Sequence, residues 1–183
     1  MLAEIYTLMD EADAIIGYNS EHFDIPILNR EFLLNGFLPP APHKNIDLYK
    51  TVKQFNFPSN KLEFVCQQLK IGGKTPHEGF DLWVKCLTGD KKAWKKMEKY
   101  NKNDTILTEA LYYKLLPWIK NHPNLNLYNN TSISCPHCGS SKLVKKRFVR
   151  TQSGVYQQYH CKKCGKYPSD RVNLIQNSKN IIR

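Results

Sequence analysis

The 183-residue sequence predicts a mixed α/β domain, rich in helices and short of strands, followed by a small basic module. Apolar residues recur at helical spacing through most of residues 1–120, and the composition changes abruptly in the last quarter of the chain. Residues 1–134 carry a net charge of +1, whereas residues 135–183 carry +10 and contain a single acid, Asp170. We therefore predict a domain over 1–120, a linker rich in Asn and Ser over 121–134, and a second module over 135–183.

The first elements follow from apolar spacing and end signals. Residues 2–13 have the spacing of an amphipathic helix, and the short apolar run over 14–18 predicts a buried strand. Asp24 is expected to cap the next helix, with Pro26 in its first turn. Gly36 is expected to end that helix.

The following stretch predicts shorter elements. Residues 45–55 read as a short strand that runs into a helix. Asn60 and Glu63 have the spacing of a capping box at the start of another helix. A further short helix is expected over 80–89, so strands remain few for a domain of this size.

A long helix closes the first domain. Asp90 is expected to cap it, and it should run over 91–116. Tyr100 and Asp104 are four residues apart, so both leave the same face, within a stripe of apolar residues. A carboxylate in such a stripe is costly to bury unless it is paired or binds a metal. Asp104 is therefore a candidate site residue, although a bond to a backbone N–H or contact with solvent would also explain it.

Two classes of protein are excluded by the sequence. No apolar run approaches the ~20 residues needed to span a bilayer, and the acidic N-terminal segment lacks the basic stretch of a signal peptide. We therefore expect no membrane partner and a cytoplasmic location, in the host cytoplasm if the protein is viral. Thiols are reduced there, so the six cysteines need an explanation other than disulfides.

Two C-x₂-C pairs lie 22 residues apart in the basic module: Cys135 and Cys138, then Cys161 and Cys164. Each pair can direct two thiolates at one point, and two pairs complete a tetrahedral Zn²⁺ site. The segment between them divides at 152–154 into two β-like arms, so we predict a zinc ribbon stabilised by its metal. Redox-active pairs, or ligation by His137 or His160, are the alternatives. Cys66 and Cys86 lie in helical patterns and are expected in the core.

The predicted arms interleave cations with aromatic residues, namely Lys145, Lys146, Arg147 and Arg150 with Phe148, Tyr156 and Tyr159. Cations can follow a phosphate backbone while aromatic rings stack on bases. We expect a nucleic-acid partner, with DNA favoured. Packing around the metal would also explain the aromatic residues, and a solvated tail would also explain the charge.

Two stretches of the first domain resemble the motifs of a known family. GYNSEHFDIPILNR, residues 17–30, is similar to the second motif of the DEDD 3′–5′ exonucleases, the DnaQ-like and family-B polymerase proofreading domains of the ribonuclease-H-like fold. YNKND, residues 100–104, resembles their third motif in its tyrosine form. The flanking sequences are similar to phage-type relatives in particular, some of which carry a C-terminal zinc ribbon.

The resemblance implies metal-dependent hydrolysis of phosphodiester bonds at 3′ ends, in DNA replication or repair. In that family four carboxylates hold two divalent ions, Mg²⁺ or Mn²⁺. Asp24 and Asp104 match the second-motif and third-motif carboxylates. Tyr100 matches the residue that helps orient the attacking water. Asn19 and Phe23 match residues that shape the pocket near the terminal nucleotides.

The family's first motif, Asp-x-Glu on an opening strand, has no match, because Glu11-x-Asp13 has the wrong order on a helical segment. We therefore expect a ribonuclease-H-like domain without its first strands, with apolar surface exposed at Ile15 and Ile16. Such a domain would need a second polypeptide or an upstream segment for two carboxylates, and would be a poor nuclease alone. The alternatives are a non-catalytic DNA-binding zinc-ribbon protein with a degenerate exonuclease domain, and a ribbon that docks a replication protein.

Overall fold

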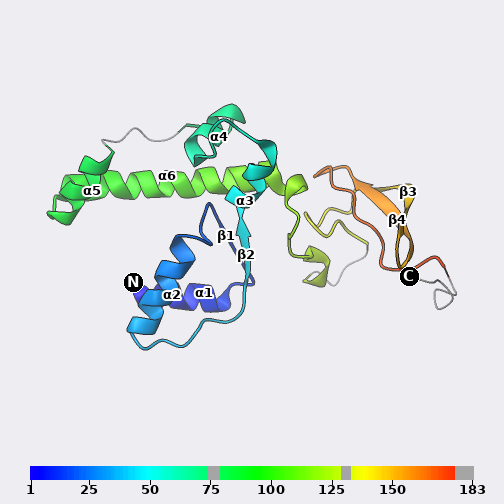
Figure 1. Ribbon diagram of the computed structural model, residues 1–183, viewed down its shortest axis with the longest axis horizontal. Coiled ribbons are helices and arrows are strands. Elements are labelled where there is room, and N and C mark those ends of the chain that lie inside the picture. The colour runs from blue at the N-terminus through cyan, green and yellow to red at the C-terminus, as the bar shows by residue number, and fades with distance from the viewer. Residues whose placement is uncertain (74–78, 129–132, 176–183) are drawn as a thin grey trace. The chain divides into compact units, whose positions relative to one another are not determined.

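The computed structural model describes residues 1–73, 79–128 and 133–175 and divides the chain into two compact units, Met1–Leu115 and Leu116–Arg183 (Figure 1). The elements of the first unit are α1 (Leu2–Glu11), β1 (Ala14–Gly17), α2 (Asp24–Leu34), β2 (Lys44–Asp47), α3 (Leu48–Val52), η1 (Lys53–Phe55), α4 (Leu62–Gln68), α5 (Phe80–Leu87) and α6 (Lys91–Leu115). The second unit contains η2 (Leu116–Trp118), η3 (Leu125–Leu127), β3 (Leu143–Thr151) and β4 (Gly154–Cys161). The predicted mixture of helices and few strands is confirmed.

A parallel pair, β1 and β2, forms the whole sheet of the first unit within the described residues. Its register runs from Ala14 opposite Lys44 to Gly17 opposite Asp47. The side chain of Ile16 is 40% exposed, as predicted, whereas Ile15 is half-buried, so the predicted exposure at Ile15 is wrong. Strand β1 also contacts α6.

Helices α1 and α2 pack through aromatic rings. Tyr6 meets Phe32 edge-on with ring centroids 5.3 Å apart, and it lies 5.0 Å from Phe37. Gly36, with φ of +76°, ends α2 as predicted. The N–H of Phe37 then donates to the Phe32 carbonyl at 2.9 Å, while that of Gly36 donates to Leu33 at 3.2 Å, the pairing of a Schellman motif.

Two predicted helix caps are wrong. Asp24 is the first residue of α2, and Phe23 occupies the cap position without a side-chain bond. The Ser20 carbonyl accepts from the N–H of Ile25 at 2.9 Å, so a main-chain carbonyl, and not the Asp24 side chain, pairs with an N–H group in the first turn of α2. Asn60 does not cap α4, because the cap position is Lys61.

The long helix α6 begins as predicted. The Asp90 carboxylate accepts from the N–H groups of Lys92 at 2.7 Å and Ala93 at 3.3 Å. Its buried face consists of Ala93, Met97, Leu107, Leu111 and Leu115. Near the start of α6 this face packs against Leu82 and Cys86 of α5. No helix in the described ranges is long and apolar enough to cross a membrane.

The second unit is built around β4. It pairs with β3 as an antiparallel hairpin whose turn lies at 152–153, which confirms the predicted division into two arms. On its other edge, the N–H of Tyr159 donates to Pro168 at 2.8 Å, and that of Cys161 donates to Lys166 at 2.9 Å. Both edges of β4 are therefore occupied. Of the predicted linker, residues 129–132 lie outside the described residues.

Candidate functional site

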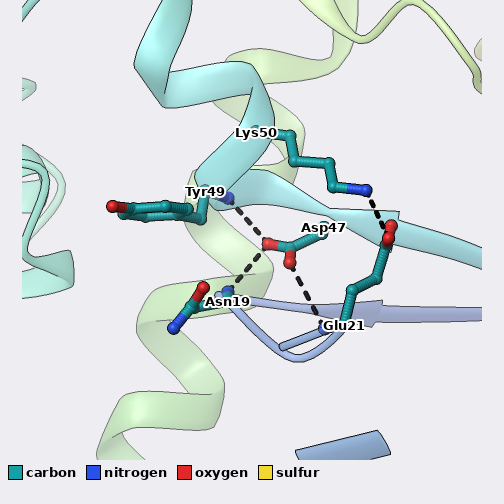
Figure 2. A network of polar contacts seen from close by, with 5 residues as sticks. All are labelled: Asn19, Glu21, Asp47, Tyr49 and Lys50. Atoms are coloured by element: carbon teal, nitrogen blue, oxygen red, sulfur yellow. Dashed lines mark hydrogen bonds and ion pairs between the residues drawn. The ribbon is translucent and has the colours of Figure 1, made fainter. Parts of the chain in front are cut away.

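A buried carboxylate holds the loop between β1 and α2. Asp47, at the end of β2, accepts from the N–H of Asn19 at 2.7 Å, of Tyr49 at 3.0 Å and of Glu21 at 3.3 Å (Figure 2). Its side chain is 5% exposed. Figure 2 also shows Lys50 paired with Glu21 across the same loop. Asp47 was not among the residues predicted from the sequence, although an acid at the junction between a strand and a helix is a usable signal.

The backbone of this loop is tightly turned. Asn19 has a φ of 60°, a left-handed conformation that asparagine adopts more readily than most residues. A Cβ on Gly17 would lie 2.3 Å from Ser20 Oγ, so only glycine fits beside the buried serine. The loop is therefore fixed from both ends before any ligand binds.

The loop presents two of the predicted site residues to solvent. Phe23 is 63% exposed and Asp24 is exposed in the first turn of α2. Asn19 is half-buried, and its side chain points away from Asp47 (Figure 2). An exposed ring beside an exposed carboxylate at a helix N-terminus can stack on a planar group and hold a cation at the same time.

Asp104 lies on the half-buried side of α6 and faces α4. Burial, and then the nearby Asp104 carboxylate, raise the pKa of the Cys66 thiol to about 11. Burial also raises the pKa of Tyr18, next to Cys66, and its hydroxyl donates to the Asn60 carbonyl at 2.5 Å. Asp104 is thus placed close to Cys66, and Cys66 in turn lies close to Tyr18, the residue after β1. Tyr100, one turn earlier, packs against the apolar cluster shared by α5 and α6.

Four cysteines converge in the second unit. The Sγ atoms of Cys135, Cys138, Cys161 and Cys164 all lie within 4.8 Å of one another. The Cys135–Cys164 and Cys138–Cys161 pairs are each 3.6 Å apart. Tetrahedral coordination with bonds of about 2.3 Å separates sulfur atoms by about 3.8 Å, so the cluster fits a metal ion such as zinc.

The thiols differ in acidity. Burial raises the pKa of Cys138 to about 11. Burial would raise the pKa of Cys161, but hydrogen bonds from the backbone N–H groups of Cys164 and Lys163 and with the Cys138 and Cys164 thiols together outweigh it and lower the pKa to about 7. His137 has a pKa lowered to about 4, first by burial and then by Lys166. Neither His137 nor His160 belongs to the four-cysteine group.

The hairpin carries exposed cations, as Lys145, Lys146, Arg147 and Arg150 are all exposed. A β-bulge between Lys145 and Phe148 places two consecutive residues opposite Gln158. A bulge of this kind turns the Lys146 and Arg147 side chains toward one face instead of opposite faces. Phe148 is 51% exposed, whereas Tyr156 and Tyr159 are half-buried.

Comparison with known families decides the class of the first unit. The model of the family RNase_H_2, in the RNase H superfamily, matches residues 1–116. The chain belongs to the RNase H superfamily. No curated protein and no solved structure matches it. The RNase H-like domain indicates nuclease-type processing of nucleic acids, with divalent metals as the ions that such domains use.

The RNase H-like domain brings its carboxylates from different elements. Asp24 begins α2, whereas Asp104 lies in the middle of α6. Within the described ranges, the four cysteines form the one group of three or more metal-ligating side chains close enough to share an ion. Neither Asp24 nor Asp104 belongs to such a group among these residues, and two carboxylates alone do not fit a two-metal site.

Proposed function

We propose that the chain is part of a metal-dependent 3′–5′ exonuclease of the DEDD type, in the tyrosine form. The observation that supports this most is the placement of Asp24 and Asp104. One follows a loop held rigidly by Asp47, and the other lies on the helix that packs against β1. The motifs around both aspartates resemble those of that family, and the superfamily match covers both of them.

Each residue has a role in this proposal. Asp24 and Asp104 are ligands for Mg²⁺ or Mn²⁺, which would polarise the scissile phosphate and a bound water when present. Tyr100 orients the attacking water from the same face of α6 as Asp104. The exposed ring of Phe23 stacks on the terminal base, and Asn19 contacts the nucleotide beside it.

The remaining ligands must be supplied by other residues. Two carboxylates offer too few oxygens for two Mg²⁺ ions. We therefore propose that an Asp-x-Glu strand, on another segment or a second polypeptide, pairs with the sheet and completes the site. In its absence the chain should bind nucleic acid but degrade it poorly.

The test is reconstitution. The chain is mixed with a polypeptide carrying an Asp-x-Glu strand, and release of mononucleotides from a 3′-labelled oligonucleotide is measured with Mn²⁺. Activity should appear only in the mixture, and Asp24→Asn or Asp104→Asn should reduce it at least 100-fold. Asp81→Asn, an exposed acid on α5, is the matched control. Full activity in either site variant would refute the assignment.

A second function is favoured by the ribbon. The four-cysteine cluster, which we propose binds Zn²⁺, supports a hairpin rich in exposed cations and poor in acids. On this alternative the chain is a non-catalytic DNA-binding protein, or its ribbon docks a replication protein. Replacing Lys145, Lys146, Arg147 and Arg150 by Ala should then remove salt-sensitive DNA binding. If binding persists unchanged, the ribbon is not the main DNA contact.

A further inference from the structure

Helix α5 is apolar around most of its circumference, although only part of it is packed. Leu82 and Cys86 are buried against α6. The opposite side carries Phe80, Trp83, Val84 and Leu87, which are 79%, 53%, 44% and 86% exposed. These four residues follow i, i+3, i+4 and i+7 spacing and so form a continuous stripe. Trp94, at the start of α6, is 54% exposed as well.

The first half of α6 is strongly basic. Residues 91–103 contain six lysines and one acid, Glu98. Lys91, Lys95, Lys99 and Lys102 are spaced by four, four and three residues, so they share one side of the helix. With a rise of 1.5 Å per residue, this row extends over about 16 Å.

Two of the acids in or beside this segment make local contacts. Asp90 is engaged in capping α6. Glu98 binds the Lys102 ammonium at 2.6 Å, and that hydrogen bond, with the charges of Lys102 and Lys95, lowers the pKa of Glu98. Residues 91–103 carry a formal net charge of +5, which favours a polyanion as the partner of this face.

We propose that the α5–α6 hairpin, residues 80–102, is a contact surface for single-stranded nucleic acid, separate from the β1–α2 loop and the ribbon. Lysines would follow the phosphates while the indole rings of Trp83 and Trp94 stack on bases. A single strand fits better than a duplex, because the bases of a duplex are stacked on one another and their faces are not available to side chains. An apolar protein partner would have to desolvate the lysine row without neutralising it.

The location of this surface suits a strand that extends away from the proposed 3′ end. Helix α5 packs against the N-terminal end of α6, whereas α3 and α4 contact the same helix further along (Figure 1). Trp94 and Asp104 are ten residues apart on α6, or about 15 Å along its axis. The surface therefore contributes to affinity for the strand and takes no part in hydrolysis.

The test uses the intrinsic fluorescence of the full chain with bound zinc. A Trp118→Phe background leaves Trp83 and Trp94 as the emitters. Oligo-dT of 15 nucleotides should quench this emission. Lys91→Ala, Lys95→Ala and Lys99→Ala together should reduce the slope of log K against log salt by about 2, since each contact with a single strand contributes about 0.7. Affinity at 0.1 M salt should fall about 100-fold.

Three exposed lysines elsewhere in the same unit provide a charge-matched control, Lys44→Ala, Lys53→Ala and Lys61→Ala. This control should change the slope by much less than the α6 variant. An equal decrease of the salt-dependence slope in both variants would mean that only net charge matters, which would refute the proposal. Absence of quenching by oligo-dT would also refute it. A blue shift with phosphatidylserine vesicles but no quenching by oligo-dT would assign the face to anionic membranes and also refute the proposal.

The outcome is independent of the proposed exonuclease. Quenching requires no catalysis, so it should occur without added Mg²⁺ or Mn²⁺ and without the Asp-x-Glu polypeptide. Trp83→Leu with Trp94→Leu should weaken binding about tenfold, measured by anisotropy of a labelled oligonucleotide, because both side chains are half-exposed and stack without supporting the core. Unchanged affinity in that variant would exclude stacking.

Discussion

Replacing Asp47 by Ala would remove one acceptor from three main-chain donors at once. The bonds to Asn19 at 2.7 Å and Tyr49 at 3.0 Å are well formed, whereas the bond to Glu21 at 3.3 Å is longer. A hydrogen bond to a charged group contributes about 1.5 kcal/mol or more, and the long bond contributes less. The free energy of unfolding of the first unit should therefore fall by about 3–4 kcal/mol.

Asp47→Asn should have an intermediate effect. Its amide oxygen can still accept from two N–H groups, but its NH₂ group must then face the third donor. We expect a loss of about 1–2 kcal/mol, because one bond is lost and two donors are brought together.

The assay is urea unfolding followed by tryptophan fluorescence in a Trp118→Phe background, so that the signal comes from the first unit. Asp10→Ala is the matched control, because the exposed Asp10 carboxylate accepts from one N–H, that of Ala41 at 2.8 Å. It should cost about 0.5–1 kcal/mol. Equal losses for Asp10→Ala and Asp47→Ala, or wild-type stability in Asp47→Asn, would refute the role assigned to Asp47.

Three further predictions concern the metal, a buried thiol and a glycine. Metal analysis should find about one zinc per chain. The Cys138→Ser substitution or a chelator should remove this zinc and unfold the ribbon, which circular dichroism would detect. Cys66 has a folded pKa of about 11, above that of an unfolded thiol, so its contribution to stability is present below pH ~9 and is lost, by roughly 2–3 kcal/mol, as the pH rises through ~11. Cys66→Ala should flatten that part of the profile, and an unchanged slope would contradict the shift. Gly17→Ala should lower the melting temperature by an amount that corresponds to about 2 kcal/mol of unfolding free energy, because the alanine Cβ would overlap Ser20. An unchanged melting temperature in Gly17→Ala would show that the loop can move to accommodate the added methyl group, and would contradict the prediction.

Much of the fold could be predicted from local pattern. The start of α6 followed from Asp90, the end of α2 from Gly36, and the four-cysteine cluster from two C-x₂-C pairs. The cap, the helix-ending glycine and each C-x₂-C pair act within a few residues, although the convergence of the two cysteine pairs is a longer-range contact. For that reason these local signals can be interpreted without knowing the tertiary structure.

Other features depend on pairings that no local pattern encodes. Asp47 acts on a loop 28 residues earlier in the chain, through the register of β1 on β2. Asp24 does not cap α2 as predicted, because the N–H of Ile25 is paired with the Ser20 carbonyl in a turn that is set by tertiary contacts. The sequence of α5 is apolar on nearly all sides, so only the packing of Leu82 and Cys86 shows which side remains exposed.

The way in which Asp47 holds the β1–α2 loop also bears on how this loop can change during evolution. Asp47 binds main-chain N–H groups of the loop, which every residue except proline possesses. Gly17 and the left-handed Asn19 are constrained by conformation, but the side chains at 21–23 are free of that requirement. Mutations there can alter what the loop touches while its path stays fixed, so new specificities are accessible without first destabilising the domain.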